Sequence, residues 1–581
     1  MNSIKYKDVL YEHRELAHLK DLLDSSAALF RDKDAFLVKD KPGGPYRAVS
    51  FGEFKADVDA LGTALLSLGL AGKNIALLGE NRYEWVVSYL AVTNGVGVVV
   101  PLDRELCAGE IAHFITRADV GAVIYSGKGE RVMEEVRAHV ATECYISMDA
   151  WENTGARRSF SRLTEEGKRL VEAGQRGYLD ARVDPESLCA ILFTSGVMGM
   201  PKGVMLSHKN IAANIRNMSR YVDVTGDHTG LSVLPMHHTY EMTCHILTAV
   251  YQGCRVAICE GLKHILKNMA EAKASVLLGV PLIFENMHRK ILRQKERTGK
   301  TRRIRGAVTL SRLLGGQNLS AARWMFRELH QATGGALHLF IAGGAPMDPE
   351  VIKDFCAMGI PMIQGYGMTE SAPIIALNKD KYSKPASVGL PLPDTEVQVI
   401  DVDEDGIGEI VCRGDSVMMG YYRDEEETKR VLVDGWLHTG DLGYFDGEGF
   451  LYVTGRKKNI IVTKNGKNIS PEEIENYLYD IPYIREVLVW GLEDGKNGDV
   501  VVCADIFPDS AFAWEEHGRP LTDDELKSAL KEAIDKVNEK MPLYKRVKRF
   551  ALREEEFEKT TTKKIKRAQQ SGIGRRGRRE L

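Results

Sequence analysis

The sequence predicts an α/β protein with a large N-terminal domain of parallel α/β sheets plus a small β-barrel, followed by an α+β C-terminal domain. In the first two-thirds of the chain, short apolar runs alternate with helix-like patterns, as in βαβ units. From about residue 386, strand-like runs are separated by hairpin turns, which indicates an antiparallel unit. A compact mixture of helix and strand patterns follows Arg456. We therefore expect domains at residues 1–457 and 458–570, and a basic, disordered tail at 571–581.

The elements of the N-terminal domain follow from the spacing of apolar residues. Runs at 75–78, 97–101 and 122–125 predict buried strands, and the periodic stretches 84–94 and 109–117 predict helices between them. The strand pattern recurs farther along the chain, at residues 189–193, 255–259, 275–278 and 337–341. This order of elements predicts βαβ units around a parallel sheet.

Hairpin signals mark the antiparallel unit. Runs at 396–400 and 409–412 flank an Asp-Glu-Asp-Gly turn, and residues 445–450 predict a second hairpin. The elements expected in the C-terminal domain are a strand at 460–463, an Asn-Gly turn at 465–466, a helix from Pro471, strands at 487–490 and 500–507, and a helix within 523–538.

Length, charge and cysteine content exclude several classes of protein. The chain has 581 residues, which is too many for one core, and its net charge of −3 favours no nucleic acid partner. The nine cysteines include no CxxC pair, so we expect reduced thiols in a cytoplasmic protein. We find no signal peptide and no run of 18 apolar residues, and expect no membrane span.

The most informative segment is the loop at residues 193–203, FTSGVMGMPKG. Its three glycines, two hydroxyls and one lysine suit a backbone that wraps phosphate oxygens, because glycine permits the conformations that turn successive N–H groups inward. The spacing excludes a Walker A loop, since Pro201 stands where that loop needs glycine and Gly203 follows the lysine.

Four further motifs follow in order: QGYGMTES at 364–371, Gly440-Asp441, GRKK at 455–458 and KTTTKKIKR at 559–567. Together with the glycine-rich loop they resemble the adenylate-forming superfamily, which includes acyl-CoA synthetases, firefly luciferase and the adenylation domains of peptide synthetases. The resemblance extends from about residue 20 to about 567 and is strongest to the AMP-forming long-chain fatty acyl-CoA ligases. It implies that the substrates are a fatty acid, ATP and coenzyme A, with Mg²⁺, and that the C-terminal domain is a mobile lid.

The resemblance also implies roles for particular residues. The phosphates of ATP would contact Thr194, Ser195, Gly196, Gly199 and Lys202. The rest of the nucleotide would lie against Gly343, Gly344, Ala345, Tyr366 and Gly367, with Asp441 on the ribose and Arg456 beside it. Taken alone, 343–345 would be a strand-to-helix turn and 438–441 an ordinary turn.

Catalytic roles are implied for Lys564, Glu370, Thr369 and His238. Lys564 would bridge the carboxylate and the α-phosphate, and Glu370 would bind the metal, since a hard cation prefers carboxylate oxygens. Without the surrounding motifs, Lys564 would belong to a solvated basic run and Thr369-Glu370 to a helix cap.

Three more positions follow from the same resemblance. Lys458 matches the hinge of the family, Gly466 the loop beside the CoA channel, and Tyr240 the acyl pocket that His238 borders. The alternative for Gly466 is a type I′ hairpin turn.

Residues 289–305 contain nine basic residues and one acidic residue. The first interpretation is a solvated face. The alternative is a peripheral contact with an anionic membrane or with CoA phosphates.

We therefore predict an enzyme that forms acyl-AMP and transfers the acyl group to CoA. One alternative is a ligase that loads a carrier protein or another thiol. A second is a weakly catalytic or noncatalytic nucleotide- or acyl-binding protein, because Val197 and Met198 stand where the family usually has hydroxyl residues. The motif around Lys564 also departs from the family pattern, with Lys563 in place of glycine.

Overall fold

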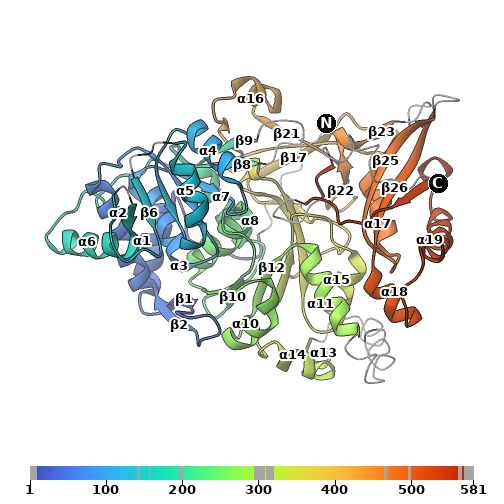
Figure 1. Cartoon of the computed structure of the whole chain (residues 1–581), viewed down its shortest axis with the longest axis horizontal. Coiled ribbons are helices and arrows are strands. Elements are labelled where there is room, and N and C mark those ends of the chain that lie inside the picture. The colour runs from blue at the N-terminus through green and yellow to red at the C-terminus, as the bar shows by residue number, and fades with distance from the viewer. Residues whose placement is uncertain are drawn as a thin grey trace.

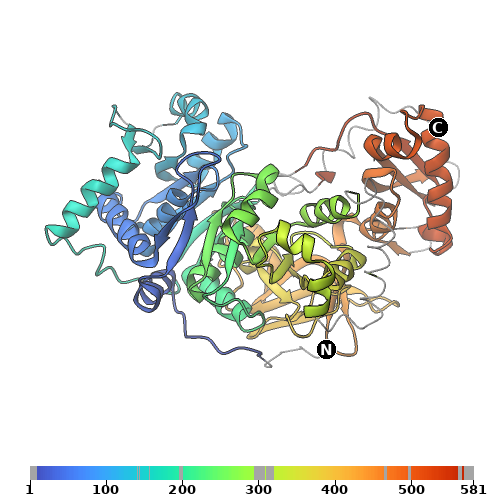
Figure 2. The ribbon, with the colours of Figure 1, turned by 90° about the horizontal axis from the view of Figure 1, so that it is seen from below.

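The structure is a computed structural model that describes residues 9–140, 142, 144–155, 157–194, 201–293, 308, 319–462, 467–494, 499–559 and 565–567. The blue-to-cyan N-terminal segments and the orange-to-red C-terminal segments lie at opposite ends of the molecule in both views (Figures 1 and 2), with the green and yellow segments between them. The predicted tail at 571–581 lies outside the described residues.

One N-terminal sheet has the strand order β19-β9-β8-β4-β3-β5-β6-β7. The strands from β8 to β7 run parallel, whereas β9 pairs antiparallel with both β8 and β19. The bounds are β3 (Asn74–Leu78), β4 (Val98–Leu102), β5 (Val120–Tyr125), β6 (Cys144–Ser147), β7 (Arg157–Ser159), β8 (Leu188–Thr194), β9 (Lys202–Ser207) and β19 (Gly420–Tyr421).

The second large sheet has the order β16-β15-β14-β13-β12-β10-β11-β1-β2, with parallel pairing from β14 to β1. Its strands are β1 (Asp34–Val38), β2 (Arg47–Ser50), β10 (Thr229–Ser232), β11 (Arg255–Ile258), β12 (Val276–Gly279), β13 (Leu339–Ala342), β14 (Met362–Gly367), β15 (Ile374–Leu377) and β16 (Leu390–Pro391). The ends of β13 and β14 lie side by side at the carboxyl edge, where α/β sheets bind ligands.

The segment predicted as a small barrel is an antiparallel sheet in the order β17-β18-β21-β20, with β22 on β21. Its strands are β17 (Thr395–Ile400), β18 (Gly408–Gly414), β20 (Leu432–Val433), β21 (Trp436–Phe445) and β22 (Leu451–Arg456). The C-terminal unit contains β23 (Ile461–Val462) paired with β24 (Asn468–Ile469), and a sheet of β25 (Ile484–Asp494), β26 (Asp499–Pro508) and β27 (Arg549–Leu552).

Helices cover these sheets (Figure 1). In the N-terminal half they are α1 (Leu19–Phe30), α2 (Phe51–Ser67), α3 (Tyr83–Ala91), α4 (Ala108–Arg117), α5 (Glu130–Arg137), α6 (Phe160–Glu172), α7 (His208–Ser219), α8 (Thr239–Glu241), α9 (Thr248–Gln252), α10 (Ile265–Ala272) and α11 (Pro281–Arg293). Farther along come α13 (Leu319–Met325), α14 (Arg327–Ala332), α15 (Pro349–Ala357), α16 (Glu425–Val431), α17 (Pro471–Tyr479), α18 (Ser510–His517) and α19 (Asp523–Asn538). Within the described ranges, no helix is both long and apolar enough to cross a bilayer.

The predicted mixed α/β architecture is confirmed, and most predicted elements are shifted by only one or two residues. A difference occurs at 84–94, where α3 stops at Ala91 and a π-helical turn, η1 (Val92–Val96), carries the chain to β4. Gly95 has φ +151° in this turn, a conformation that side chains rarely adopt. The predicted turn at 465–466 lies outside the described residues.

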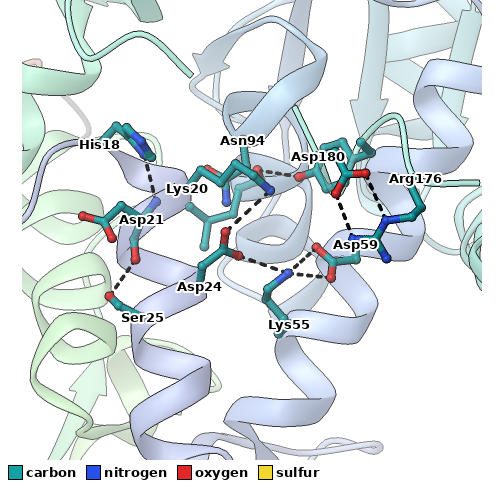
Figure 3. A network of polar contacts seen from close by, with 12 residues as sticks. His18, Lys20, Asp21, Asp24, Ser25, Lys55, Asp59, Asn94, Arg176 and Asp180 are labelled. Carbon is teal, nitrogen blue, oxygen red and sulfur yellow. Dashed lines mark hydrogen bonds and ion pairs between the residues drawn. The ribbon is translucent and has the colours of Figure 1, made fainter. Parts of the chain in front are cut away.

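A polar network fastens α1 to α2 at the N-terminal end of the molecule (Figure 3). Lys55 Nζ lies 2.6 Å from Asp59 Oδ2 and 3.1 Å from Asp24 Oδ1, and Lys20 Nζ lies 3.6 Å from Asp24 Oδ2. Burial raises the pKa of the Asp59 carboxyl, and Lys55 opposes that shift. The network therefore keeps partly buried charges paired beside the apolar core.

Because α6 packs closely on α2, we predict that adding a side chain at Gly167 destabilises the protein. A Cβ there would lie 1.8 Å from the carbonyl oxygen of Ala60, so Gly167→Ala cannot fit without separating the helices. We expect the free energy of unfolding to fall by about 1–3 kcal/mol, measured by urea unfolding, although alanine is the better helix former. Gly109→Ala in α4 is the control, because a Cβ there meets nothing within 4 Å. Equal stability of the two variants would contradict the packing argument.

Candidate functional site

A cavity of about 2850 Å³ lies between the N-terminal sheets, the antiparallel sheet and the C-terminal unit. Its lining includes every predicted site residue that the structure describes: Thr194, Lys202, His238, Tyr240, Gly343, Gly344, Ala345, Tyr366, Gly367, Thr369, Glu370, Asp441, Arg456 and Lys458. The other predicted positions lie outside the described residues, namely Ser195, Gly196, Gly199, Gly466 and Lys564. Segments that are far apart in the sequence thus converge on one cavity.

The ends of the predicted phosphate loop are held by a β-hairpin. Thr194 ends β8, Lys202 begins β9, and the two are cross-strand partners. The sequence interpretation did not include β9. Ser207 ends β9 and caps α7, with its side chain accepting from Asn210 N at 3.1 Å. The hairpin places a hydroxyl and an ammonium group side by side at the cavity.

Asp441 forms a polar cluster with Tyr366 and Arg456. The Tyr366 hydroxyl donates to Asp441 Oδ2 at 2.7 Å, and Arg456 Nε lies 2.8 Å from Asp441 Oδ1. Asp441 on β21 and Arg456 on β22 are cross-strand partners, whereas Tyr366 comes from β14. The side chain of Asp441 is only 6% exposed, and a carboxylate has about four acceptor sites, so it retains capacity for further donors such as a vicinal diol.

Small residues at 343–345 make room beside the aromatic ring of Tyr240. A Cβ on Gly343 would lie 2.8 Å from Tyr240 Cζ, and the Tyr240 hydroxyl donates to the Ile341 carbonyl at 3.0 Å. Gly344 has φ +82°, which favours glycine. The turn after β13 therefore presents backbone to the cavity, as a flat ligand ring requires.

Glu370 is a buried carboxylate in the short 3₁₀ turn η5 (Thr369–Ser371) that follows β14. The Tyr421 hydroxyl donates to its Oε1 at 2.9 Å. Burial raises the pKa of Glu370, and the Tyr421 bond opposes the shift. Among the described residues, no group of three or more His, Cys, Asp or Glu side chains could hold a metal. Mg²⁺ is usually bound by one or two carboxylates together with phosphates and water, and the Glu370 carboxylate is a side chain that could hold such an ion.

Lys202 forms an ion pair with Glu427 of α16. Its Nζ also lies 5.1 Å from the ring centroid of Tyr421, close enough for a cation–π contact. The predicted phosphate lysine is thus paired with a carboxylate that the sequence interpretation did not include. In the sequence around Glu427, the one feature that marks this carboxylate is the Glu-Glu-Glu run at 425–427.

Lys458 stands among other cations in the 3₁₀ turn η6 (Lys457–Asn459). Although its side chain is exposed, it faces the cavity, and desolvation by the surrounding protein lowers the pKa of its amine to about 8, with Arg456 contributing next. Its neighbour Lys457 instead pairs with Glu409 at 2.8 Å. The amines of these two neighbouring lysines therefore differ in pKa, which is lowered for Lys458 and raised for Lys457.

One side of the cavity is apolar. It is lined by members of a single hydrophobic cluster, Met218, Val222, Val224, Ile341, Ile374 and Leu377. The continuous run α8, the π-helix η3 (Met242–Leu247) and α9 borders the same side, from Tyr240 to Gln252. His238 precedes this run, and its ring lies 4.3 Å from that of His237 between centroids.

The flanks of the last sequence motif also reach the cavity. Lys559 and residues 565–567 line it, and Arg567 Nη1 donates to the Val489 carbonyl at 3.0 Å. Burial raises the pKa of Glu475 to about 7, and its ion pair with Arg567 opposes the shift. The chain on both sides of Lys564 is therefore placed at the cavity.

The basic stretch at 289–305 is described only at its start. Arg289 Nη1 lies 3.7 Å from Asp509 Oδ2 of the C-terminal unit, so this member of the stretch faces a carboxylate of the protein itself. Most of the remainder lies outside the described residues.

Comparison with known families and proteins agrees with this arrangement. The model of the AMP-binding enzyme family matches residues 23–422, and that of the AMP-binding enzyme C-terminal domain matches 458–572. The chain is 29% identical to long chain acyl-CoA synthetase 6, peroxisomal, of Arabidopsis thaliana, over 87% of this chain and 75% of that protein. It is 27% identical to the long-chain-fatty-acid–CoA ligase FadD15 of Mycobacterium tuberculosis, over 92% of each.

Solved structures share the fold. The anthranilate CoA ligase AuaEII in complex with anthranoyl-AMP superposes with a TM-score of 0.76 at 19% identity, over 96% of each chain. ATP-bound MatB from Rhodopseudomonas palustris gives 0.73 at 25% identity, over 95% of this chain and 97% of that one.

The lowered pKa of Lys458 predicts selective chemical labelling. At pH 8 about half of the Lys458 amines are neutral, against less than about 1% of ordinary lysines with a pKa near 10.4. An amine-reactive acylating reagent, followed by peptide mass spectrometry, should modify Lys458 well before Lys457. Arg456→Gln should raise the pKa of Lys458 and slow its labelling at pH 8. Equal labelling rates for the two lysines from pH 7 to 9 would contradict the assigned pKa.

Proposed function

Because the chain belongs to the AMP-binding enzyme family, we propose that it is an AMP-forming acid–thiol ligase that converts a medium- or long-chain fatty acid to its acyl-CoA. The observation that carries the proposal is one cavity in which the predicted nucleotide residues adjoin an apolar side. The fatty acid is further supported by relatives named as long-chain acyl-CoA synthetases or ligases.

The reaction has two steps. In the first, a carboxylate oxygen attacks the α-phosphorus of ATP, the bond to the β-phosphate breaks, and pyrophosphate leaves from an acyl-adenylate. In the second, the thiol sulfur of CoA attacks the acyl carbon, its proton is lost, and AMP leaves. Both steps bring anions together, so fixed cations and N–H donors are the main requirement.

The residues of the cavity suit these requirements. In the proposal, Asp441 accepts the ribose hydroxyls while Arg456 holds the carboxylate in place, and Tyr366 contacts the adenine beside Gly343–Ala345. Lys202 and the loop after Thr194 bind the β- and γ-phosphates. A Mg²⁺ ion on Glu370 would neutralise phosphate charge. Lys564 donates to the oxygens that gain charge in the first step.

The apolar side of the cavity suits an acyl chain. The helical run from Thr239 to Gln252 is about 20 Å long at 1.5 Å per residue, and residues along it line the cavity. Burying methylene groups there contributes about 0.8 kcal/mol each, which favours longer acids. Tyr240 packs against Gly343 of the predicted adenine site, and His238 lines the same cavity.

The C-terminal unit at 458–570 is proposed to act as the lid. Lys458 would be the hinge about which the lid turns between the two steps, and Gly466 would border the CoA channel. A closing lid protects the mixed anhydride from water. The unit has its own apolar core, formed by residues between 461 and 547, which supports its movement as a body.

The direct test is pyrophosphate release from the full-length protein, ATP and Mg²⁺ across a panel of carboxylic acids, with and without CoA. We expect release to depend on a fatty acid, and AMP turnover to depend on CoA. Turnover that needs a carrier protein instead of CoA would favour the alternative acceptor. If no acid supports release, the binding-protein alternative based on Val197 and Met198 replaces the enzyme.

Lys564→Ala should abolish adenylation while leaving thioester formation from supplied acyl-adenylate nearly intact. Removing one preorganised donor to a transition state costs about 3–4 kcal/mol, or about 10²–10³ in rate. The two half-reactions are measured separately in quenched assays. Lys536→Ala is the control, since it removes an exposed lysine whose ion pair is with Glu532 on α19. Near-normal adenylation by Lys564→Ala would remove Lys564 from the mechanism.

A cytoplasmic location with peripheral membrane contact through 289–305 is also proposed. Trp324 and Leu319 on α13, which comes after this stretch in the sequence, are 74% and 40% exposed, which supports an interfacial role. Replacing Arg302, Arg303 and Arg305 with Gln should weaken sedimentation with anionic vesicles at low salt, and added salt should have the same effect on the parent. Unchanged sedimentation would leave the solvated-face interpretation.

A further inference from the structure

The structure pairs Lys202 with a carboxylate of its own chain. The Lys202 and Glu427 side chains, 30% and 17% exposed, form an ion pair at the start of β9. Both residues line the cavity. A phosphate chain that binds Lys202 must therefore compete with Glu427.

Hydrogen bonds hold the first turn of α16, and with it the backbone of Glu427, against β19. Asp424 caps α16 by accepting from Glu427 N at 3.2 Å. The Thr428 hydroxyl donates to the Asp424 carbonyl at 2.7 Å and accepts from Tyr421 N at 2.8 Å. These bonds tie the first turn of α16 to β19, which itself pairs with β9, the strand of Lys202.

A second cation, Arg430, also pairs with Glu427 and shares its Oε1 with Lys202. The Arg430 guanidinium donates Nε to Glu427 Oε2 at 2.6 Å and Nη2 to Oε1 at 2.5 Å. Arg430 is the largest cause, followed by Lys202, of the low pKa of Glu427, about 2. The carboxylate therefore remains ionised and retains one cationic partner when the other leaves.

We propose that Glu427 is an internal competitor for the nucleotide phosphates. It neutralises Lys202 in the nucleotide-free protein and is retained by Arg430 alone when a β,γ-phosphate chain takes Lys202. This inference rests on the proposed function, because it uses the phosphate role of Lys202. Glu427 acts through Lys202 and is a positioning residue. The competition affects the affinity for ATP and pyrophosphate, whereas AMP lacks the phosphates that reach Lys202.

The test is calorimetric binding of ATP, pyrophosphate and AMP to the full-length protein, with no carboxylic acid or CoA present. Glu427→Gln should lower the Kd for ATP and pyrophosphate by about two- to fivefold, the range expected for a partly exposed ion pair. Arg430→Gln should have the opposite effect and raise both Kd values, because Glu427 loses its bonds to Arg430 and its ion pair with Lys202 becomes stronger. The Kd for AMP should change in neither variant.

Glu426→Gln is the matched control, because it removes the same charge from an exposed position on the same helix. It should leave all three Kd values unchanged. If Glu427→Gln unfolds early in a thermal melt, Glu427→Asp replaces it and should give a smaller shift in the same direction, since the shorter carboxylate withdraws from Lys202.

Three outcomes would overturn the inference. They are an unchanged Kd for ATP in Glu427→Gln, an equal change for AMP, or an equal change in Glu426→Gln. Because the assay contains no acid, failure of the proposed function does not affect it. A shift in ATP binding without any fatty-acid-dependent pyrophosphate release would support the role of Glu427 as a competitor and would contradict the proposed ligase activity.

Discussion

The position of Asp441 is the constraint on which the rest of the site depends. Its carboxylate joins three segments that are distant in the sequence: Tyr366 at the end of β14, Asp441 itself on β21, and Arg456 at the end of β22. The chain leaves Arg456 directly into η6 and the C-terminal unit. One buried carboxylate therefore fixes the antiparallel sheet against the carboxyl edge of the parallel sheet and sets the point from which the proposed lid begins.

Charge balance is the second principle of this cavity. Without a ligand, its cations are largely neutralised by carboxylates of the protein: Arg456 by Asp441 and Lys202 by Glu427. Lys458 adjoins Arg456 instead, and desolvation, followed by repulsion from Arg456, lowers its pKa to about 8. A polyphosphate therefore enters a site in which some attractive groups are already paired. Phosphate binding to Lys202 therefore displaces the Glu427 carboxylate. The affinity for phosphate then depends on Arg430, which holds the displaced carboxylate, as well as on Lys202.

The sequence was sufficient for the parts of the fold that local pattern determines. Apolar runs predicted β3, β4, β5 and β8 to within two residues, and the superfamily resemblance and the mixed α/β fold are confirmed. It missed β9, because a six-residue strand between a glycine-rich loop and a helix cap has no separate signal. It also missed Glu427, which lies 225 residues from Lys202, since an ion pair between distant segments leaves no trace in local spacing. The roles of Ser195, Gly466 and Lys564 stay predictions.

The most direct test of the account is a crystal structure of the full chain with a non-hydrolysable acyl-adenylate. We expect the ribose hydroxyls to donate to Asp441 at about 2.6–3.0 Å, with the adenine against Tyr366 and residues 343–345. The acyl chain should run along the helical segment toward Gln252. A nucleotide bound elsewhere, with Asp441 still contacted only by Tyr366 and Arg456, would contradict the central claim that this carboxylate organises the active site.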